Sequence, residues 1–592
     1  MSKILRMVLG SAVLFGLAGC GGGSKTTPPQ SAPSPAIFTV APSSAIVPIN
    51  QPQQFNAFLS NVIGSQPSTW SVNGVAGGNS TVGTITTAGL YTAPASFPSP
   101  NTVMIGAALI SDSSKTANAN VAVEFPNDNH LSQGIPVKLG TTGGNSTDIS
   151  AGFCCSGTLG SLWTRADLTN AVILSNNHVL DKSSFGAVND PVGQPGLADN
   201  NCVAGTLVAR MRVAATLKPS PCTTTPCSGQ APSNVDAAIA EVIAPTAVDA
   251  LGSILDLGPA GATSIAAAPP STLTATTTIG GMVAKSGRTT GLTCSTLLAN
   301  TNVTVTYESA CNGAAAFTAQ FNNQTVVSGG NFSAGGDSGS LIVDATNSRA
   351  VALLYAGNSA STVGNPIADV ISVLSNGPAN TLTLVGGGDH AVSCAPEATA
   401  SSVTASANDV TGLSPAQVQR ATNAKQAFAA QSMRDSAISS VVAGKSADNP
   451  RESALVIHVN STPFTSIPAQ VNGVRTRVVY DTGGETQPLL AAQDLERGTA
   501  LRDNYSKTML GKQGVYGVGI GMSDDNPPEP ALVFFVDPAA NHPAFPAVIE
   551  GMRTRIIEGE PFRAFGWNQR LEPKTGGCSK PASMSTVGKG LK

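Results

Sequence analysis

The chain has 592 residues, a formal net charge of −3, and a charged-residue content of only 11 %. A chain of this length exceeds what one hydrophobic core can organise, so several domains are expected. The small net charge gives no electrostatic reason to bind nucleic acid, and no nucleic-acid partner is expected. Ser, Thr, Asn, Ala and Gly take the place of charged residues, a composition typical of β-rich exported proteins with many turns.

The first twenty residues have the features of a targeting signal. A positive region with Lys3 and Arg6 precedes a mostly apolar run at 7–17, which is too short to span a membrane. The run ends in LAGC, which resembles a bacterial lipobox, where the cysteine, here Cys20, is acylated and becomes the N-terminus. This predicts an exported protein, anchored by lipid to the bacterial cell envelope. An ordinary cleavable signal with a chance cysteine is the alternative.

Two regions follow the signal segment of residues 1–20. Residues 21–36 are rich in Gly, Pro and Ser and are expected to be a flexible tether. Residues 37–124 alternate short apolar runs with turn residues, which predicts a small β-sandwich. The stretch TWSVNGVAGGNSTVGTITTAGLYTAP at 69–94 resembles bacterial immunoglobulin-like domains of surface proteins, with Trp70 as the core tryptophan. The resemblance implies a spacer or, alternatively, a ligand-binding module.

The remaining chain changes character near residue 389. Strand-like runs dominate residues 130–388, which are long enough for two small β-barrels. A linker rich in Ala, Ser and Thr at 389–413 leads to residues 414–570, where two similar helix–strand–turn–strand units follow each other. These units predict one pseudo-symmetric α+β domain, followed by a tail at 571–592. The fold class expected for the whole chain is multidomain and mostly β.

A candidate nucleophile lies in the sequence GGDSGS at 335–340. Attack by a serine needs an exposed hydroxyl and backbone N–H groups aimed at the developing oxyanion. Glycines on both sides of a serine permit the tight turn that supplies those groups. Ser338 is therefore the predicted nucleophile, and a Gly/Ser-rich turn without chemistry is the alternative for this motif taken alone.

A candidate general base and its partner precede that serine. His178 follows the apolar run AVIL and the polar turn SNN, and it is the one histidine well inside residues 130–388. Imidazole titrates near neutrality, as a general base for serine requires. Asp236 directly precedes the apolar run AAIA, so its carboxylate can be buried against the imidazole and stabilise the imidazolium. Other aspartates also lie between the histidine and the serine, among them Asp190, Asp199 and Asp256, and none of these three leads so directly into an apolar strand.

The order His178, Asp236, Ser338 resembles the triad of chymotrypsin-like serine proteases. KSGRTTGLTC at 285–294 resembles a strand and turn of streptogrisin-type enzymes, and LLYAG at 353–357 resembles the strand that holds substrate backbone beside the pocket. The resemblance implies a double β-barrel and a serine endopeptidase. Such an enzyme hydrolyses polypeptides through an acyl-enzyme and needs no metal or organic cofactor.

The resemblance also implies roles for individual residues around the serine. The N–H groups of Gly336 and Ser338 would form the oxyanion hole. Phe332, Tyr355 and Gly357 would line the substrate pocket. Phe332 stands where trypsin-like enzymes carry an acidic residue, and it has no charge. A buried Arg or Lys side chain would lack a counter-charge there, so apolar side chains are the expected substrates.

Nine cysteines remain after Cys20, so at least one thiol is free or intermolecular. Export permits disulfides. The segment between Cys294 and Cys311 reads as a strand flanked by turns, and a hairpin there would bring the two together, which predicts a disulfide. Cys222 and Cys227 are a second candidate pair, across a Pro-containing loop.

Two other motifs are set aside. DTG at 481–483 looks like an aspartic-protease signature, but that chemistry needs two facing carboxylates and no second such triplet occurs. GVGIG at 517–521 is a Gly-rich strand rather than a phosphate loop, because it lacks the glycine spacing and the Lys-Ser/Thr of such loops. The competing function is a surface binding or adhesion lipoprotein that keeps a protease scaffold without turnover. The sequence does not indicate whether the protein is a monomer or an oligomer.

Overall fold

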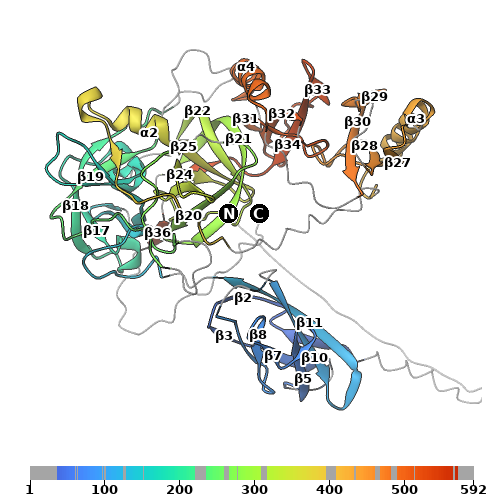
Figure 1. Cartoon of the computed structure of the whole chain (residues 1–592), viewed down its shortest axis with the longest axis horizontal. Helices are drawn as coiled ribbons and strands as arrows, with labels where there is room; N and C mark the ends of the chain where they lie inside the picture. Colours follow the sequence, from blue (N-terminus) through green and yellow to red (C-terminus); the bar gives the residue numbers. More distant parts are fainter. Residues whose placement is uncertain are drawn as a thin grey trace, which may run out of the picture.

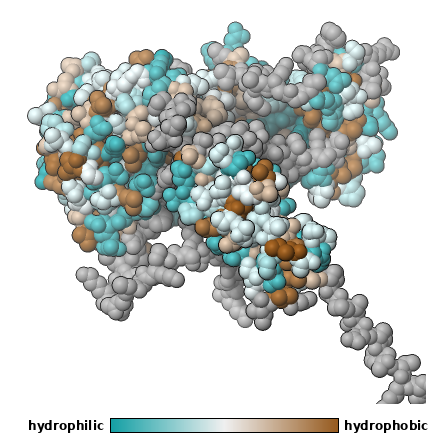
Figure 2. Space-filling view, turned by 60° about the horizontal axis from the view of Figure 1, so that its bottom comes forward, coloured by the Kyte–Doolittle hydropathy of each residue, from teal (hydrophilic) through white to brown (hydrophobic). Residues whose placement is uncertain are grey.

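A computed structural model describes the chain from residue 36 to residue 570, mostly as β-structure in several units (Figure 1). No helix in this described part is long and apolar enough to cross a membrane. Hydrophilic and hydrophobic residues are interspersed over the face seen in Figure 2. The predicted lipidation site Cys20 lies outside the described residues, as do Cys222, Cys227 and Cys311. The positions not described are 1–35, 61, 63, 96–97, 99–101, 125–127, 151–152, 220–234, 259–265, 276–277, 309–315, 395–408, 433–434, 461–466, 482–489, 513, 528, 565–566 and 571–592.

The N-terminal unit, blue in Figure 1, is built from small β-sheets. Five strands pair in the order β2-β11-β10-β5-β6, four in the order β3-β9-β8-β7, and β1 pairs with β4. Trp70 lies in its apolar core with Phe55 and Tyr91, while the immunoglobulin-like assignment stays a prediction. The strands are β1 (Phe38–Ala41), β2 (Ser44–Pro48), β3 (Pro52–Gln54), β4 (Asn56–Leu59), β5 (Ser68–Val72), β6 (Val75–Ala76), β7 (Gly78–Asn79), β8 (Gly83–Ile85), β9 (Leu90–Thr92), β10 (Thr102–Leu109) and β11 (Asp112–Glu124).

The next strands form a first barrel. They pair in the order β14-β12-β17-β18-β19-β16-β15, and since only Gly160 separates β14 from β15, the sheet closes on itself. β16 and β19 are buried along their whole length, as the apolar runs of the sequence require. The elements are β12 (Thr141–Asn145), β13 (Ile149–Ser150), β14 (Phe153–Leu159), β15 (Ser161–Thr164), β16 (Val172–Ser175), α1 (Asn177–Leu180), η1 (Lys182–Ser184), β17 (Pro191–Gln194), η2 (Leu197–Asp199), β18 (Thr206–Ala214) and β19 (Ala238–Val242).

A second barrel follows. Its strands pair in the order β20-β23-β24-β25-β22-β21, and a further pairing of β20 with β21 closes the ring. A short C-terminal strand of this region, β26, returns to β15 of the first barrel. The elements are β20 (Met282–Gly287), β21 (Gly291–Tyr307), β22 (Phe317–Ser328), β23 (Leu341–Asp344), β24 (Ala350–Gly357), β25 (Ser361–Pro366), α2 (Ile367–Leu374), η3 (Pro378–Asn380) and β26 (Thr383–Leu384).

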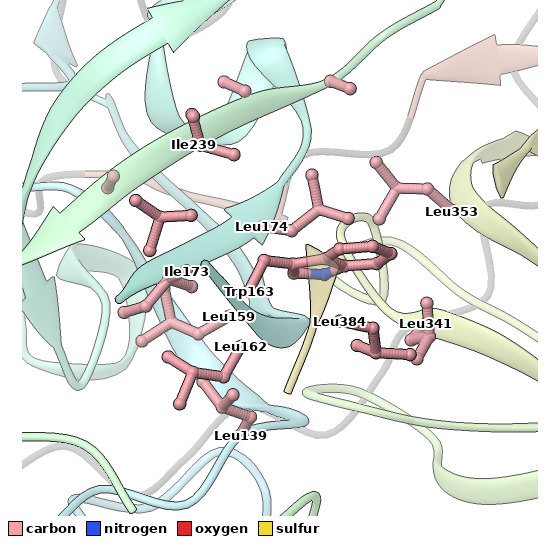
Figure 3. Close-up of a cluster of buried hydrophobic side chains, with 14 of the residues drawn as sticks. Leu139, Leu159, Leu162, Trp163, Ile173, Leu174, Ile239, Leu341, Leu353 and Leu384 are labelled. Atoms are coloured by element: carbon pink, nitrogen blue, oxygen red, sulfur yellow. The ribbon is translucent and has the colours of Figure 1, made fainter. Parts of the chain in front are cut away.

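One apolar cluster joins the two barrels around Trp163 (Figure 3). Leu174 and Ile239 reach it from the first barrel, and Leu341 and Leu353 reach it from the second. Burying an aromatic side chain of this size is among the larger apolar contributions that one residue makes. The cluster therefore fixes the ends of β16 and β19 next to the turn that precedes β23.

The two C-terminal repeat units fold alike. Their sheets have the orders β27-β28-β30-β29 and β31-β32-β34-β33, each with one helix before its first strand. They exchange matching bonds: Arg475 donates to Oγ1 and O of Thr554, and Arg553 donates to Oγ1 and O of Thr476. The elements are α3 (Pro415–Ser432), β27 (Ile438–Lys445), β28 (Ser453–Val459), β29 (Gln470–Val471), β30 (Val474–Tyr480), α4 (Ala492–Met509), β31 (Val515–Met522), β32 (Pro530–Val536), β33 (Val548–Ile549), β34 (Met552–Glu558), β35 (Arg563–Ala564) and β36 (Trp567–Arg570).

The sequence predicted one α+β domain over 414–570, and the second repeat unit of that region also extends the second barrel. β31 pairs antiparallel with β21, with Gly519 opposite Thr301. A Cβ at Gly519 would lie 2.4 Å from the Thr301 hydroxyl oxygen, so only glycine permits this approach. The first unit has Val442 at the matching register position, and β27 has no partner beyond β28 in the described sheets. Strands β35 and β36 also pair with barrel strands.

Candidate active site

The imidazole of His178 and the carboxylate of Asp236 are in direct contact. His178 lies on α1, directly after β16, and Asp236 lies just before β19, which pairs with β16. The distance from His178 Nδ1 to Asp236 Oδ2 is 2.6 Å, and the His178 backbone N–H donates to Oδ1. Both residues are buried. Adjacent strands of one sheet therefore deliver a charge-assisted pair to the same end of the first barrel.

Groups of the second barrel complete the surroundings of Asp236. The Tyr307 hydroxyl, at the end of β21, donates to Asp236 Oδ2 over 2.8 Å. The Asp236 backbone N–H donates to Asn365 Oδ1. Burial, followed by the Asp236 charge, raises the pKa of the Tyr307 hydroxyl well above its ordinary value, so the hydroxyl keeps the proton that it donates. Sequence reasoning missed Tyr307, since nothing in its local sequence marks it as a partner of Asp236.

The turn that carries Ser338 is shaped by two glycines. Gly336 and Gly339 have φ values of 100° and 99°, which L-residues rarely adopt. A Cβ at Gly339 would lie 2.2 Å from Ser175 Oγ and from Thr158 O, so the turn is pressed against the first barrel. The N–H groups of Gly336 and Ser338 have no acceptor among the described residues.

Ser338 is fully buried, whereas the sequence led us to expect an exposed hydroxyl. Its hydroxyl donates to Tyr355 O over 3.2 Å. His178 Nε2 is also buried and has no hydrogen-bond partner in the described part of the chain. Thr158 of β14 joins the two halves, because its N–H donates to Ser338 O and its carbonyl accepts from Ser175, three residues before the histidine. The structure thus brings the serine turn beside the histidine without a bond between their side chains.

A buried ion pair holds the serine turn from behind. Asp337 Oδ2 lies 3.5 Å from Lys285 Nζ, and both side chains are fully buried. Asp337 Oδ1 accepts the N–H groups of Thr289 and Thr290. Burial lowers the pKa of Lys285, and the Asp337 carboxylate opposes this by stabilising the ammonium. The sequence did not identify the partner of Asp337, which comes from the KSGRTTGLTC segment.

The predicted pocket residues all lie in the second barrel. Phe332 is buried in an apolar cluster with Val283 and Leu297, and its carbonyl accepts from Thr293. Tyr355 packs its ring in another cluster, 4.9 Å from the ring of Phe321 between centroids, and offers its carbonyl to Ser338. Gly357 ends the same strand, β24. That Phe332 lines a substrate pocket stays a prediction.

The predicted disulfide between Cys294 and Cys311 is wrong, because Cys294 is bonded to Cys394. Their Cα atoms lie 5.8 Å apart although 100 residues separate them in sequence. The bond ties β21 to the chain that leaves the second barrel, so a tertiary approach rather than a local hairpin made the pair. A second disulfide joins Cys154 on β14 to Cys202.

The described residues contain no cluster of three or more His, Cys, Asp or Glu that could hold a metal ion.

Asp148 lies close enough to the site to interact with His178. Burial raises the pKa of Asp148 to about 6, against the lowering influence of Lys182 and His178.

No protein-family model and no curated protein matches the chain. A glutamic-acid-specific serine protease that uses a histidine triad in substrate binding has a TM-score of 0.27 and 18 % identity, covering 42 % of this chain and 100 % of that one. Thermobifida fusca Protease A has a TM-score of 0.26 and 16 % identity, covering 42 % and 99 %. Nocardiopsis protease has a TM-score of 0.25 and 18 % identity, covering 37 % and 89 %. The similarity to these bacterial serine proteases is weak and extends over less than half of this chain.

Proposed function

We propose that the protein is a serine endopeptidase that hydrolyses peptide bonds through an acyl-enzyme on Ser338. The observation that carries the proposal is the buried bond of 2.6 Å between His178 Nδ1 and Asp236 Oδ2, at the barrel end against which the Ser338 turn is packed. A carboxylate on Nδ1 fixes the tautomer that leaves Nε2 free to accept a proton. His178 Nε2 is buried and has no hydrogen-bond partner among the described residues, so it is suited to accept the proton of the Ser338 hydroxyl when a substrate is bound.

The chemistry follows from these positions. Rotation about the Ser338 Cα–Cβ bond moves Oγ from Tyr355 O toward His178 Nε2. Oγ then attacks the substrate carbonyl carbon while Nε2 takes its proton, and Asp236 stabilises the imidazolium. The N–H groups of Gly336 and Ser338 stabilise the oxyanion. Nε2 returns the proton to the leaving amine, and a water molecule attacks the ester in the same way, which releases the acid product and regenerates the serine.

Labelling by a peptidyl phosphonate, which forms a covalent bond with an activated serine, tests the proposal. The Ser338→Ala variant should lose both labelling and peptide hydrolysis, because triad serines typically contribute on the order of a millionfold to turnover. Ser340→Ala is the matched control in the same loop and should still label, since within the described structure the Ser340 hydroxyl donates to Asp337 O and to no other group. Near-native hydrolysis by Ser338→Ala would reject the assignment.

A second candidate function is peptide binding without turnover. The Ser338 hydroxyl bonds Tyr355 O instead of His178 Nε2. This favours binding without turnover, because a serine that does not bond a general base is not activated. A protein that binds peptides but is never labelled by phosphonates would establish this function instead.

We further propose that the protein acts outside the cytoplasm, attached to the cell envelope by lipid on Cys20. The lipobox-like sequence LAGC supports this. Metabolic labelling with a fatty-acid analogue should mark the wild type and not Cys20→Ser.

A further inference from the structure

The chain after the second repeat unit returns to the second barrel. Phe562 is fully buried in the apolar cluster of Tyr355, and its carbonyl accepts the N–H of Thr306. The next two residues form β35, which pairs antiparallel with β24: Arg563 lies opposite Gly357, and Ala564 opposite Ala356. The C-terminal segment thus adds a strand directly beyond Tyr355, whose carbonyl accepts from the candidate nucleophile.

Three residues further on, the same segment reaches the first barrel. β36 pairs antiparallel with β14, with Trp567 opposite Ser156 and Arg570 opposite Phe153. β14 lies on the other side of the serine turn, since the N–H of its residue Thr158 donates to Ser338 O. The two pairings therefore flank Ser338, one from each barrel.

The covalent chain links these flanking strands by a short path. Only three peptide bonds connect Ala564 to Trp567, and a chain of that length extends about 11 Å at most. A substrate must cross the same region to present its carbonyl to Ser338, and the commonest way for an enzyme to hold an extended peptide is as an added strand on a sheet edge. The strand-pairing edges that a substrate needs are occupied.

We propose that strands β35 (Arg563–Ala564) and β36 (Trp567–Arg570) act together as an intramolecular peptide ligand of the candidate active site and block the entry of other substrates. The inference rests on the proposed function, because it assigns the ligand and regulation of that same site. Full burial of Ser338 fits a covered site.

Side-chain contacts anchor the segment at its beginning. Asn358 Nδ2 donates to Glu560 O over 2.6 Å, and Ser359 Oγ donates to Glu560 Oε2 over 2.7 Å. Arg563 pairs with Glu308. These contacts lie on residues next to β24 and β21, outside the triad. A tethered ligand held in this way competes at a high effective concentration, typically millimolar for short linkers.

The test weakens β36 without touching the triad. Because strand addition depends on backbone N–H groups, Asn568→Pro with Gln569→Pro in one full-length chain removes two consecutive donors, one of which faces β14. Asn568→Ala with Gln569→Ala is the matched control, which keeps both donors. If β36 is released from β14 in less than a tenth of the wild-type molecules, the Pro variant should hydrolyse an added peptide with a kcat/KM about tenfold or more above the wild type. The Ala control should match the wild type.

Two further measurements keep the inference separate from the proposed function. A synthetic peptide of residues 560–570 should inhibit the Pro variant competitively, and a scrambled peptide should not. Hydrogen exchange at the β14 amides should become faster in the Pro variant alone, whether or not the protein is an enzyme. Equal activity in all three proteins, with unchanged β14 exchange, would overturn the inference and leave the endopeptidase standing. Faster exchange without hydrolysis or phosphonate labelling in any of them would overturn the endopeptidase, and with it the inhibitory role.

Discussion

The two halves of the candidate site are held in different ways. The histidine half belongs to the first barrel, yet the second barrel supplies the Tyr307 hydroxyl that bonds Asp236 and the Asn365 oxygen that accepts its backbone N–H. Its geometry therefore depends on the junction between the barrels. A group positioned by partners from another unit is sensitive to any small shift of that unit.

The serine half is held mainly within its own barrel. The Lys285–Asp337 pair is fully buried, and Asp337 also accepts backbone N–H groups of the neighbouring turn. Low dielectric makes such a network strong when it is complete and costly when it is broken. The comparison teaches that damage at the histidine half should appear first in turnover, while damage at the serine half should appear first in folding.

The largest effect is expected at the histidine half. Asp236→Asn keeps the shape of the side chain but removes the charge that stabilises the imidazolium and fixes its tautomer, and kcat should fall by about ten-thousandfold. Asp190→Asn is the control, because Asp190 bonds Asn145 and Lys182 and does not reach the imidazole. Similar losses in both variants, measured as kcat on one peptide, would remove Asp236 from its role.

At the serine half, Asp337→Ala should destabilise the fold by about 3–5 kcal/mol, because it leaves the Lys285 ammonium buried without its partner. Combining it with Lys285→Met should restore part of that loss, since the uncompensated charge is gone. Urea unfolding of the three proteins measures both effects. If the double variant is no more stable than Asp337→Ala, the ion pair does not stabilise the serine turn.

Tyr307→Phe tests how strongly the histidine half depends on the second barrel. A hydrogen bond to a charged group contributes about 1.5–3 kcal/mol, so kcat should fall by about tenfold to a hundredfold with little change in KM. Tyr355→Phe is the matched comparison, because the Tyr355 hydroxyl is buried without a partner in the described structure and should cost less. Equal kcat losses in the two variants would show that Tyr307 acts by packing alone.

The smallest effect concerns Asp256, which lies in the field of Lys285. Burial, helped by the Asp128 charge, raises the pKa of Asp256 to about 7 from its ordinary value of 3.8. Between those pH values the native state binds a proton that the unfolded chain has released, so stability falls as pH rises through this window. Asp256→Asn should flatten the curve, by on the order of 1 kcal/mol or more between pH 4 and pH 8. An unchanged pH dependence of urea midpoints would contradict this.

The sequence was enough to propose catalytic candidates, but it did not indicate the residues that surround them. His178, Asp236 and Ser338 each adjoin an apolar strand or a glycine-rich turn, so local pattern is enough to single them out. Tyr307 and Lys285 could not be assigned in this way, because each acts on a residue far away in sequence. The disulfide prediction was wrong for the same reason. A local hairpin favoured Cys311 as the partner of Cys294, whereas the tertiary fold brings Cys394 to it.

The repeat units show the same limit. Their matching sequences predicted matching topologies, which the two sheets have. The sequence did not predict that one unit joins the second barrel, although the glycine at 519, where the other unit has Val442, is what permits the approach to Thr301.

By itself, the sequence determined what depends on neighbouring residues: the buried strands, the repeat, and the residue types able to perform acyl transfer. Only the tertiary structure decided that β35 and β36 lie along β24 and β14, and that Ser338 is buried. The physical reason is that strand pairing uses backbone groups, which every residue carries. A segment therefore gives little local sign of the sheet edge that it will join.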